Sequence, residues 1–85
     1  MKVHIPSALR SYTDNADSEA NGTTLAEALI DLDRHHPGIR FRMIDEQDRI
    51  RRHIRIFVNG TQRTDLAHAL APSDEIVIAQ ALSGG

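Results

Sequence analysis

The chain has 85 residues, enough for one small domain with a modest hydrophobic core. Its formal net charge of −2 argues against a generic nucleic-acid binder, and its lack of cysteine excludes disulfides, thiolate metal sites, iron–sulfur clusters and a cysteine nucleophile. No apolar run approaches the roughly 20 residues of a membrane span, and residues 1–4 do not open a signal peptide, so we expect a cytoplasmic protein without membrane association.

The first quarter of the chain predicts two short strands. Residues 2–5 alternate between polar and apolar side chains, and Pro6 ends this strand. Residues 7–15 predict a turn, and residues 17–20 predict a second strand that pairs back on the first. The side chains expected to face or anchor the core are Val3, Ile5, Leu9, Tyr12, Ser18 and Ala20.

An amphipathic helix is the clearest predicted element. Thr24 and Glu27 have the spacing of a capping box, in which two side chains satisfy backbone N–H groups at the helix start. Pro37 and Gly38 end the helix after about three turns. Its apolar face, which we expect to lie on a sheet, consists of Leu25, Ala28, Leu29 and Leu32.

Two histidines, His35 and His36, fall at the end of this helix. Adjacent helical residues point about 100° apart and cannot chelate one ion together, and a histidine near a helix C-terminus usually complements the macrodipole. The other histidines, which have no motif spacing, are His4, His53 and His68. We therefore predict neither a metal site nor a catalytic constellation in this chain.

The middle of the chain is basic. Residues 39–44 predict an irregular or single-turn segment that packs beside the helix through Ile39, Phe41, Met43 and Ile44, and residues 45–48 predict a polar turn. Between residues 38 and 63, seven arginines face three acids. Such a run is usually a solvated face whose arginines pair with nearby acids, here Asp45, Glu46 and Asp48; contact with RNA or with an acidic partner is the alternative. The arginines are Arg40, Arg42, Arg49, Arg51, Arg52, Arg55 and Arg63.

The last third of the chain predicts two more strands. Residues 53–58 alternate cleanly, and Asn59 with Gly60 is a strong signal for a tight turn. Residues 66–70 suggest a short helical turn, and residues 72–75 predict a turn. Residues 76–79 are apolar, and the first three are β-branched, so they predict a buried final strand.

Phe57 lies on the face of the predicted strand 53–58 away from its apolar residues, beside Arg55. An aromatic side chain on the solvent face of a strand is either covered by a local loop or available to a partner. Phe57 and Arg55 are therefore our candidate partner surface.

The chain ends in two glycines shortly after the final strand. Residues 80–85 could extend about 20 Å, enough to enter another protein's active site. Glycine has no Cβ to clash with a narrow channel, so Gly84 and Gly85 suit a carboxylate that is activated as an acyl adenylate. A sulfur nucleophile could then displace AMP and leave a thiocarboxylate, with every catalytic group on the partner. A frayed end, where small residues gather because nothing packs there, is the simpler alternative.

Several segments, in this order and at this length, carry a family resemblance: TLAEAL at residues 24–29, IFVNG at 56–60, IVI at 76–78 and the final GG. Together they resemble the MoaD/ThiS family of ubiquitin-like sulfur carriers. IPSALRSYT at residues 5–13 and ALSGG at 81–85 resemble its CysO-like branch. The resemblance implies an α+β, β-grasp fold, a mixed sheet packed on one main helix, with a domain over residues 1–79 and a flexible tail over residues 80–85.

The resemblance also implies a function. An E1-like (MoeB/ThiF-type) enzyme would adenylate Gly85 with Mg-ATP, and a sulfur donor such as a rhodanese-type protein would supply the sulfur. An acceptor such as cysteine synthase or the molybdopterin synthase large subunit would receive it, for cysteine, molybdopterin, thiamine or tRNA thiolation. The chain itself would bind no cofactor and would not be an enzyme. The tail residues required for activation would be Gly84, Ser83, Leu82 and Ala81.

Two other functions stay open. The chain could be a ubiquitin-like modifier conjugated through Gly85 to lysines of other proteins, although Lys2 is its single lysine and offers little for building chains on itself. It could instead be a β-grasp binding or RNA-contacting module whose tail is inert.

Overall fold

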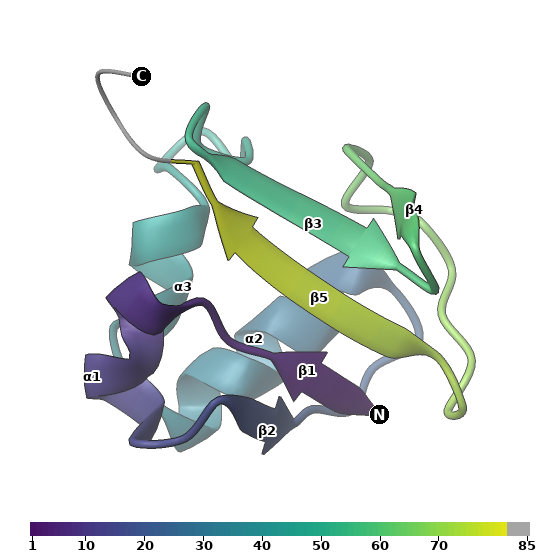
Figure 1. The fold of residues 1–85 in the computed structure, drawn as a ribbon. Coiled ribbons are helices and arrows are strands. Elements are labelled where there is room, and N and C mark those ends of the chain that lie inside the picture. The colour runs from purple at the N-terminus through teal and green to yellow at the C-terminus, as the bar shows by residue number, and fades with distance from the viewer. Residues whose placement is uncertain (82–85) are drawn as a thin grey trace.

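A five-stranded mixed sheet forms one layer of the molecule, seen here in a computed structural model that describes residues 1–81. From one edge to the other, its strands are β2 (Asp17–Glu19), β1 (Lys2–His4), β5 (Glu75–Gln80), β3 (Ile54–Val58) and β4 (Thr61–Gln62). Strands β1 and β5 are parallel neighbours, and the other neighbouring pairs are antiparallel (Figure 1). The first and last described strands therefore lie side by side within the sheet.

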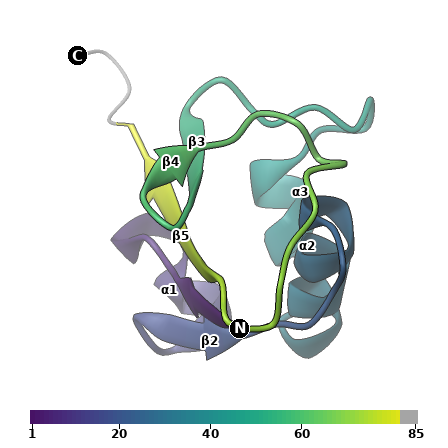
Figure 2. The same ribbon diagram turned by 90° about the vertical axis from the view of Figure 1, so that its right-hand side faces the viewer.

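Helices supply the second layer. The main helix α2 (Leu25–His35) and the single turn α3 (Ile39–Met43) lie on one side of the sheet (Figure 2). A 3₁₀ turn, η1 (Ser7–Leu9), and the short helix α1 (Arg10–Thr13) connect β1 to β2. A mixed sheet in this strand order, wrapped on one main helix, is a β-grasp fold, so the predicted α+β class is confirmed.

The core lies between α2 and the sheet, because each presents one apolar face to the other. The four residues predicted for the apolar face of α2 are all buried, and so are alternate residues of β3 and β5. Tyr12, predicted as an anchor, is partly buried against this core. The buried apolar residues are Val3, Ile5, Leu9, Ala20, Leu25, Ala28, Leu29, Leu32, Ile39, Met43, Ile44, Ile54, Ile56, Val58, Ile76 and Ile78.

Helix α2 begins with the predicted cap in a modified form. The Glu27 N–H donates to Thr24 Oγ1 at 3.2 Å, which confirms Thr24 as the N-cap. The Glu27 carboxylate accepts its main hydrogen bonds from Thr23, one residue earlier than in a standard capping box: from the hydroxyl and the N–H of Thr23, both at 2.7 Å. These two bonds lower the pKa of Glu27, so its charged form stabilises the start of the helix.

The helical turn predicted at residues 66–70 is confirmed only as one hydrogen-bonded turn, in which the His68 N–H donates to Asp65 O at 3.1 Å, and the segment forms no helix. The segment passes the start of α2, where its carbonyl groups accept hydrogen bonds from the helix. The Leu25 N–H donates to His68 O at 3.0 Å, and the Ala26 N–H donates to Leu66 O at 2.8 Å. The first N–H groups of a helix have no partner within the helix, so this loop satisfies them from outside. The apolar spacing of residues 66–70 fits a helix equally well, so the sequence pattern alone does not distinguish a helix from this loop.

Two other segments differ from prediction in detail. Residues 7–15, predicted as a turn, hold the two short helices η1 and α1. The single turn predicted within residues 39–44 is confirmed as α3, but Phe41 is 57% exposed instead of packed. Ile39 and Met43 are four residues apart and share the buried face of α3, whereas Phe41 lies between them and points away.

The tight turn predicted at Asn59 and Gly60 is confirmed. Both residues have positive φ, 52° and 86°, as a type I′ hairpin turn requires. The turn leads into β4, which was not predicted because a strand of two residues is too short for a pattern of alternation to mark it.

Candidate functional site

The predicted tail leaves the sheet from the end of β5. Gln80, the first residue of the predicted tail, still belongs to β5 and pairs with Ile54 of β3. Ala81 is exposed, and its N–H donates to His53 O at 2.8 Å. The other predicted tail residues, Leu82, Ser83, Gly84 and Gly85, lie outside the described residues. The base of the predicted tail is thus fixed by backbone hydrogen bonds to β3.

Phe57 and Arg55 lie on the sheet face opposite α2, since their neighbours in β3 are buried in the core. The register places Phe57 beside Val77 and Arg55 beside Ala79 of β5. Phe57 is half-buried and Arg55 is exposed, with its guanidinium folded back onto Arg52 O at 2.6 Å. The two candidate partner residues therefore share one face with the outward side chains of the strand that leads to the tail.

The far end of this sheet face is acidic. His4 Nδ1 lies 2.6 Å from Asp17 Oδ1, and His4 Nε2 lies 2.9 Å from Glu75 Oε2. The hydrogen bond with Glu75 is the main cause that raises the pKa of His4; desolvation comes next and lowers it, and the charges of Asp17 and Glu75 raise it again. Along β5, the outward face thus runs from a carboxylate–histidine cluster, past Val77, to Arg55 near the tail.

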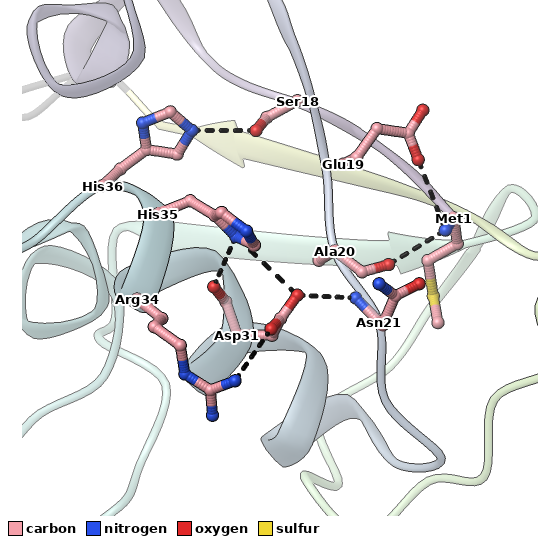
Figure 3. Close-up of polar contacts among 9 residues, drawn as sticks. All are labelled: Met1, Ser18, Glu19, Ala20, Asn21, Asp31, Arg34, His35 and His36. Carbon is pink, nitrogen blue, oxygen red and sulfur yellow. Dashed lines mark hydrogen bonds and ion pairs between the residues drawn. The ribbon is translucent and has the colours of Figure 1, made fainter.

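The histidines at the end of α2 have local partners (Figure 3). His36 Nε2 is hydrogen-bonded to Ser18 Oγ at 2.9 Å, which ties the helix end to β2, and His35 Nδ1 donates to Asp31 O at 3.0 Å. Asp31 also accepts from the Asn21 N–H at 2.9 Å. Within residues 1–81, no cluster of three or more histidine and acidic side chains could hold a metal ion. These contacts support the structural interpretation of the two histidines.

None of the helices within residues 1–81 has the length and apolar content that crossing a bilayer needs. The arrangement described above consists of a small domain, a sheet face opposite α2, and strand β5, which leads into the predicted tail.

Comparison with known proteins supports the β-grasp fold described above and indicates the family. The model of the ThiS family matches residues 3–85. No match was found among the curated proteins. A chain of the crystal structure of the BexX/CysO complex of Amycolatopsis orientalis is 31% identical, with a TM-score of 0.90, and the match covers 99% of this chain and 98% of that one.

Two further solved structures are similar over nearly the whole chain. CysO of Mycobacterium tuberculosis, described as an antigen, is 31% identical with a TM-score of 0.89, and the match covers 95% of this chain and 98% of that one. SAMP1 of Haloferax volcanii is 25% identical with a TM-score of 0.81, and the match covers 100% of this chain and 98% of that one.

Proposed function

Because the chain belongs to the ThiS family of ubiquitin-like sulfur carriers, and to its CysO-like branch, we propose that its C-terminal carboxylate is the group that carries sulfur. The observation that carries the proposal is that the family match extends through Gly85. The fixed base of the tail at Ala81 supports it as well, since an end that leaves a well-paired strand can be presented in a defined direction.

The proposed chemistry takes place on Gly85 and uses catalytic groups of a partner. A carboxylate oxygen attacks the α-phosphorus of Mg-ATP, and pyrophosphate leaves. Hydrosulfide, or the terminal sulfur of a persulfide, then attacks the acyl carbon, and AMP leaves. If the sulfur comes from a persulfide, a thiol must cleave the remaining S–S bond to release the thiocarboxylate. The domain itself contributes the surface by which the partner holds it, and ATP consumption makes the cytoplasm the proposed place of action.

The proposed partners are an E1-like (MoeB/ThiF-type) adenylating enzyme, a rhodanese-type sulfur donor and an acceptor enzyme such as cysteine synthase or the molybdopterin synthase large subunit. A CysO relative that is 31% identical occurs in a complex with BexX, which supports docking of this chain on a second protein. Phe57 and Arg55, on the sheet face that leads to the tail, are the proposed contact residues.

Intact-mass measurement tests the proposal. The purified protein, an E1-like enzyme from the same organism, Mg-ATP and sulfide should give a mass gain of about 16 Da, the replacement of one oxygen by sulfur. Deletion of Gly85, or Gly84→Trp, should abolish the gain because the end no longer fits the channel. The melting temperature of both variants should stay within about 1 °C of the wild type, since the described core ends at Ile78.

No mass gain with the wild-type protein would contradict the proposal. A gain that persists without Gly85 would place the modification elsewhere, and a large loss of thermal stability on deletion would give the tail a structural role.

A second candidate function is protein modification through Gly85, because SAMP1 relatives at 25% identity are small archaeal modifier proteins. Both functions begin with the same adenylate and differ in the nucleophile that attacks it. Immunoblots of cells that express a tagged chain separate them: adducts of higher mass that require Gly85 favour modification, and thiocarboxylate without such adducts favours sulfur carriage.

A further inference from the structure

The basic segment keeps a surplus of positive charge at the surface. Two of its arginines have acidic partners, as predicted: Arg40 with Asp48 at 3.2 Å, and Arg49 with Asp45 at 3.8 Å. Within residues 1–81, the other five arginines of this segment form no ion pair: Arg42, Arg51, Arg52, Arg55 and Arg63. The interpretation of the segment as a solvated face with local acidic partners therefore accounts for only part of it.

One of these arginines holds an exposed aromatic ring in place. The Arg51 guanidinium carbon lies 4.7 Å from the centre of the Phe41 ring, and Arg51 Nε donates to Phe41 O at 2.8 Å. The Arg51 N–H also donates to Met43 O at 2.8 Å, so its backbone is tied to α3. An exposed aromatic side chain fixed beside an arginine is the composition of a protein-interaction hot spot, and its order lowers the entropy cost of binding.

This pair lies next to the base of the predicted tail. Phe41, Arg42, Arg51 and His53 line a surface hollow of about 310 Å³, which we call the Phe41 surface. The carbonyl of His53 accepts the hydrogen bond from the Ala81 N–H. The end of β5 and the start of β3 lie at the same end of the molecule (Figure 1). A protein that receives the tail would therefore face the Phe41 surface at close range.

We propose that the Phe41 surface is a second docking surface, which binds an acidic patch beside the channel of the enzyme that activates the tail. This inference rests on the proposed function, and it adds a contact separate from Phe57 and Arg55. Charge complementarity carries it: residues 38–63 have a formal charge of +4, while the rest of the chain has −6. The negative charge on the rest of the chain disfavours RNA as the partner, because it would repel the RNA phosphates in most orientations of approach.

A charge reversal with a matched control tests the proposal. Arg42 is exposed in α3 and forms no ion pair within residues 1–81, so Arg42→Glu should leave the fold intact. Arg34→Glu makes the same change of charge on α2, where the side chain is 72% exposed; it also breaks the pair with Asp31 at 3.4 Å, so any effect on the fold appears in its melting temperature. Phe41→Ala removes the ring, and Phe41 O stays available to Arg51. The dissociation constant of each full-length variant for the E1-like enzyme is measured without ATP.

We expect Arg42→Glu and Phe41→Ala each to weaken binding by about tenfold at low ionic strength, and Arg34→Glu by less than about twofold. The effect of Arg42→Glu should shrink at about 1 M salt, where screening removes most of the attraction. Melting temperatures show whether each variant is folded.

The proposal is overturned if Arg42→Glu and Phe41→Ala bind as the wild type does, if Arg34→Glu costs as much as Arg42→Glu, or if the wild type does not bind the enzyme. It is also overturned if Arg42→Glu loses binding to a polyuridine RNA and keeps its affinity for the enzyme. The proposed function fails separately: wild-type binding that Arg42→Glu weakens, without any gain in mass with ATP and sulfide, would keep the docking surface and reject sulfur carriage.

Discussion

His4 couples three strands through its side chain, because Asp17 lies on β2 and Glu75 on β5. Its pKa is raised above the ordinary 6.5, chiefly by the hydrogen bond with Glu75. Protonated His4 therefore stabilises the fold fully below about pH 6.5, and this contribution is lost as the pH rises through the folded pKa.

The variant His4→Gln should reveal this dependence. The difference in melting temperature between wild type and His4→Gln should be largest near pH 6 and should shrink by about pH 8.5. His35→Gln, which changes a histidine outside the cluster, is the control. A difference for His4→Gln that stays constant over this pH range would show that the ion pairs contribute nothing to stability.

Phe57 supports a second prediction at this scale. Phe57→Glu should weaken association with the activating enzyme by about tenfold or more, because a desolvated carboxylate replaces an apolar contact on the open sheet face. Phe57→Leu keeps an apolar side chain beside Val77 and should bind nearly as well. Calorimetry measures the affinity of each variant for the enzyme. Equal affinity of Phe57→Glu and wild type would show that Phe57 is a local packing residue.

At the scale of elements, Asn59 joins the β3–β4 turn to the start of β5. Its side chain donates to Asp74 Oδ1 at 2.9 Å and accepts from the Glu75 N–H at 3.0 Å, while its φ of 52° is unfavourable for most residues. Asn59→Ala should lower the free energy of unfolding by about 2 kcal/mol, through lost hydrogen bonds and backbone strain.

Asn59→Gly separates these two causes, since glycine accepts positive φ and lacks the hydrogen-bonding side chain. Urea unfolding should place Asn59→Gly between the wild type and Asn59→Ala, although the entropy of glycine in the unfolded state reduces the gap. If all three proteins unfold at the same urea concentration, the side-chain hydrogen bonds and the positive φ of Asn59 do not affect stability.

Elements with a strong local pattern were predictable from the sequence. Helix α2, strands β1, β3 and β5 and the turn at Asn59 and Gly60 follow from periodicity, capping and turn chemistry. Residues 66–70 did not, because their conformation is decided by the N–H groups of α2, which lie far away in sequence. Strand β4 was missed because its two residues form a strand only through pairing with β3.

At the scale of the whole molecule, part of the candidate site could likewise be predicted from the sequence and part could not. The order of segments and the terminal glycines indicated the family, which the match over residues 3–85 confirms. The role of Gly85 stays a prediction, since it lies outside the described residues. The Phe41 surface could not be predicted, because apolar residues among arginines indicate a segment that packs its apolar side chains against the core. Only the placement of α3 in the structure exposes the Phe41 ring and brings Arg51 over it.

The position of β5 also bears on how the protein is made and degraded. Because β5 separates β1 from β3 in the sheet, a polypeptide that stops before Glu75 would leave two isolated hairpins, and a lone two-stranded hairpin is marginally stable at best in water. Premature termination, or a protease cut ahead of this strand, would thus yield an unfolded fragment that the cell degrades. It would not yield a folded fragment that competes with the intact protein. Any copy that survives in the cell therefore carries β5, the strand that precedes the proposed reactive end.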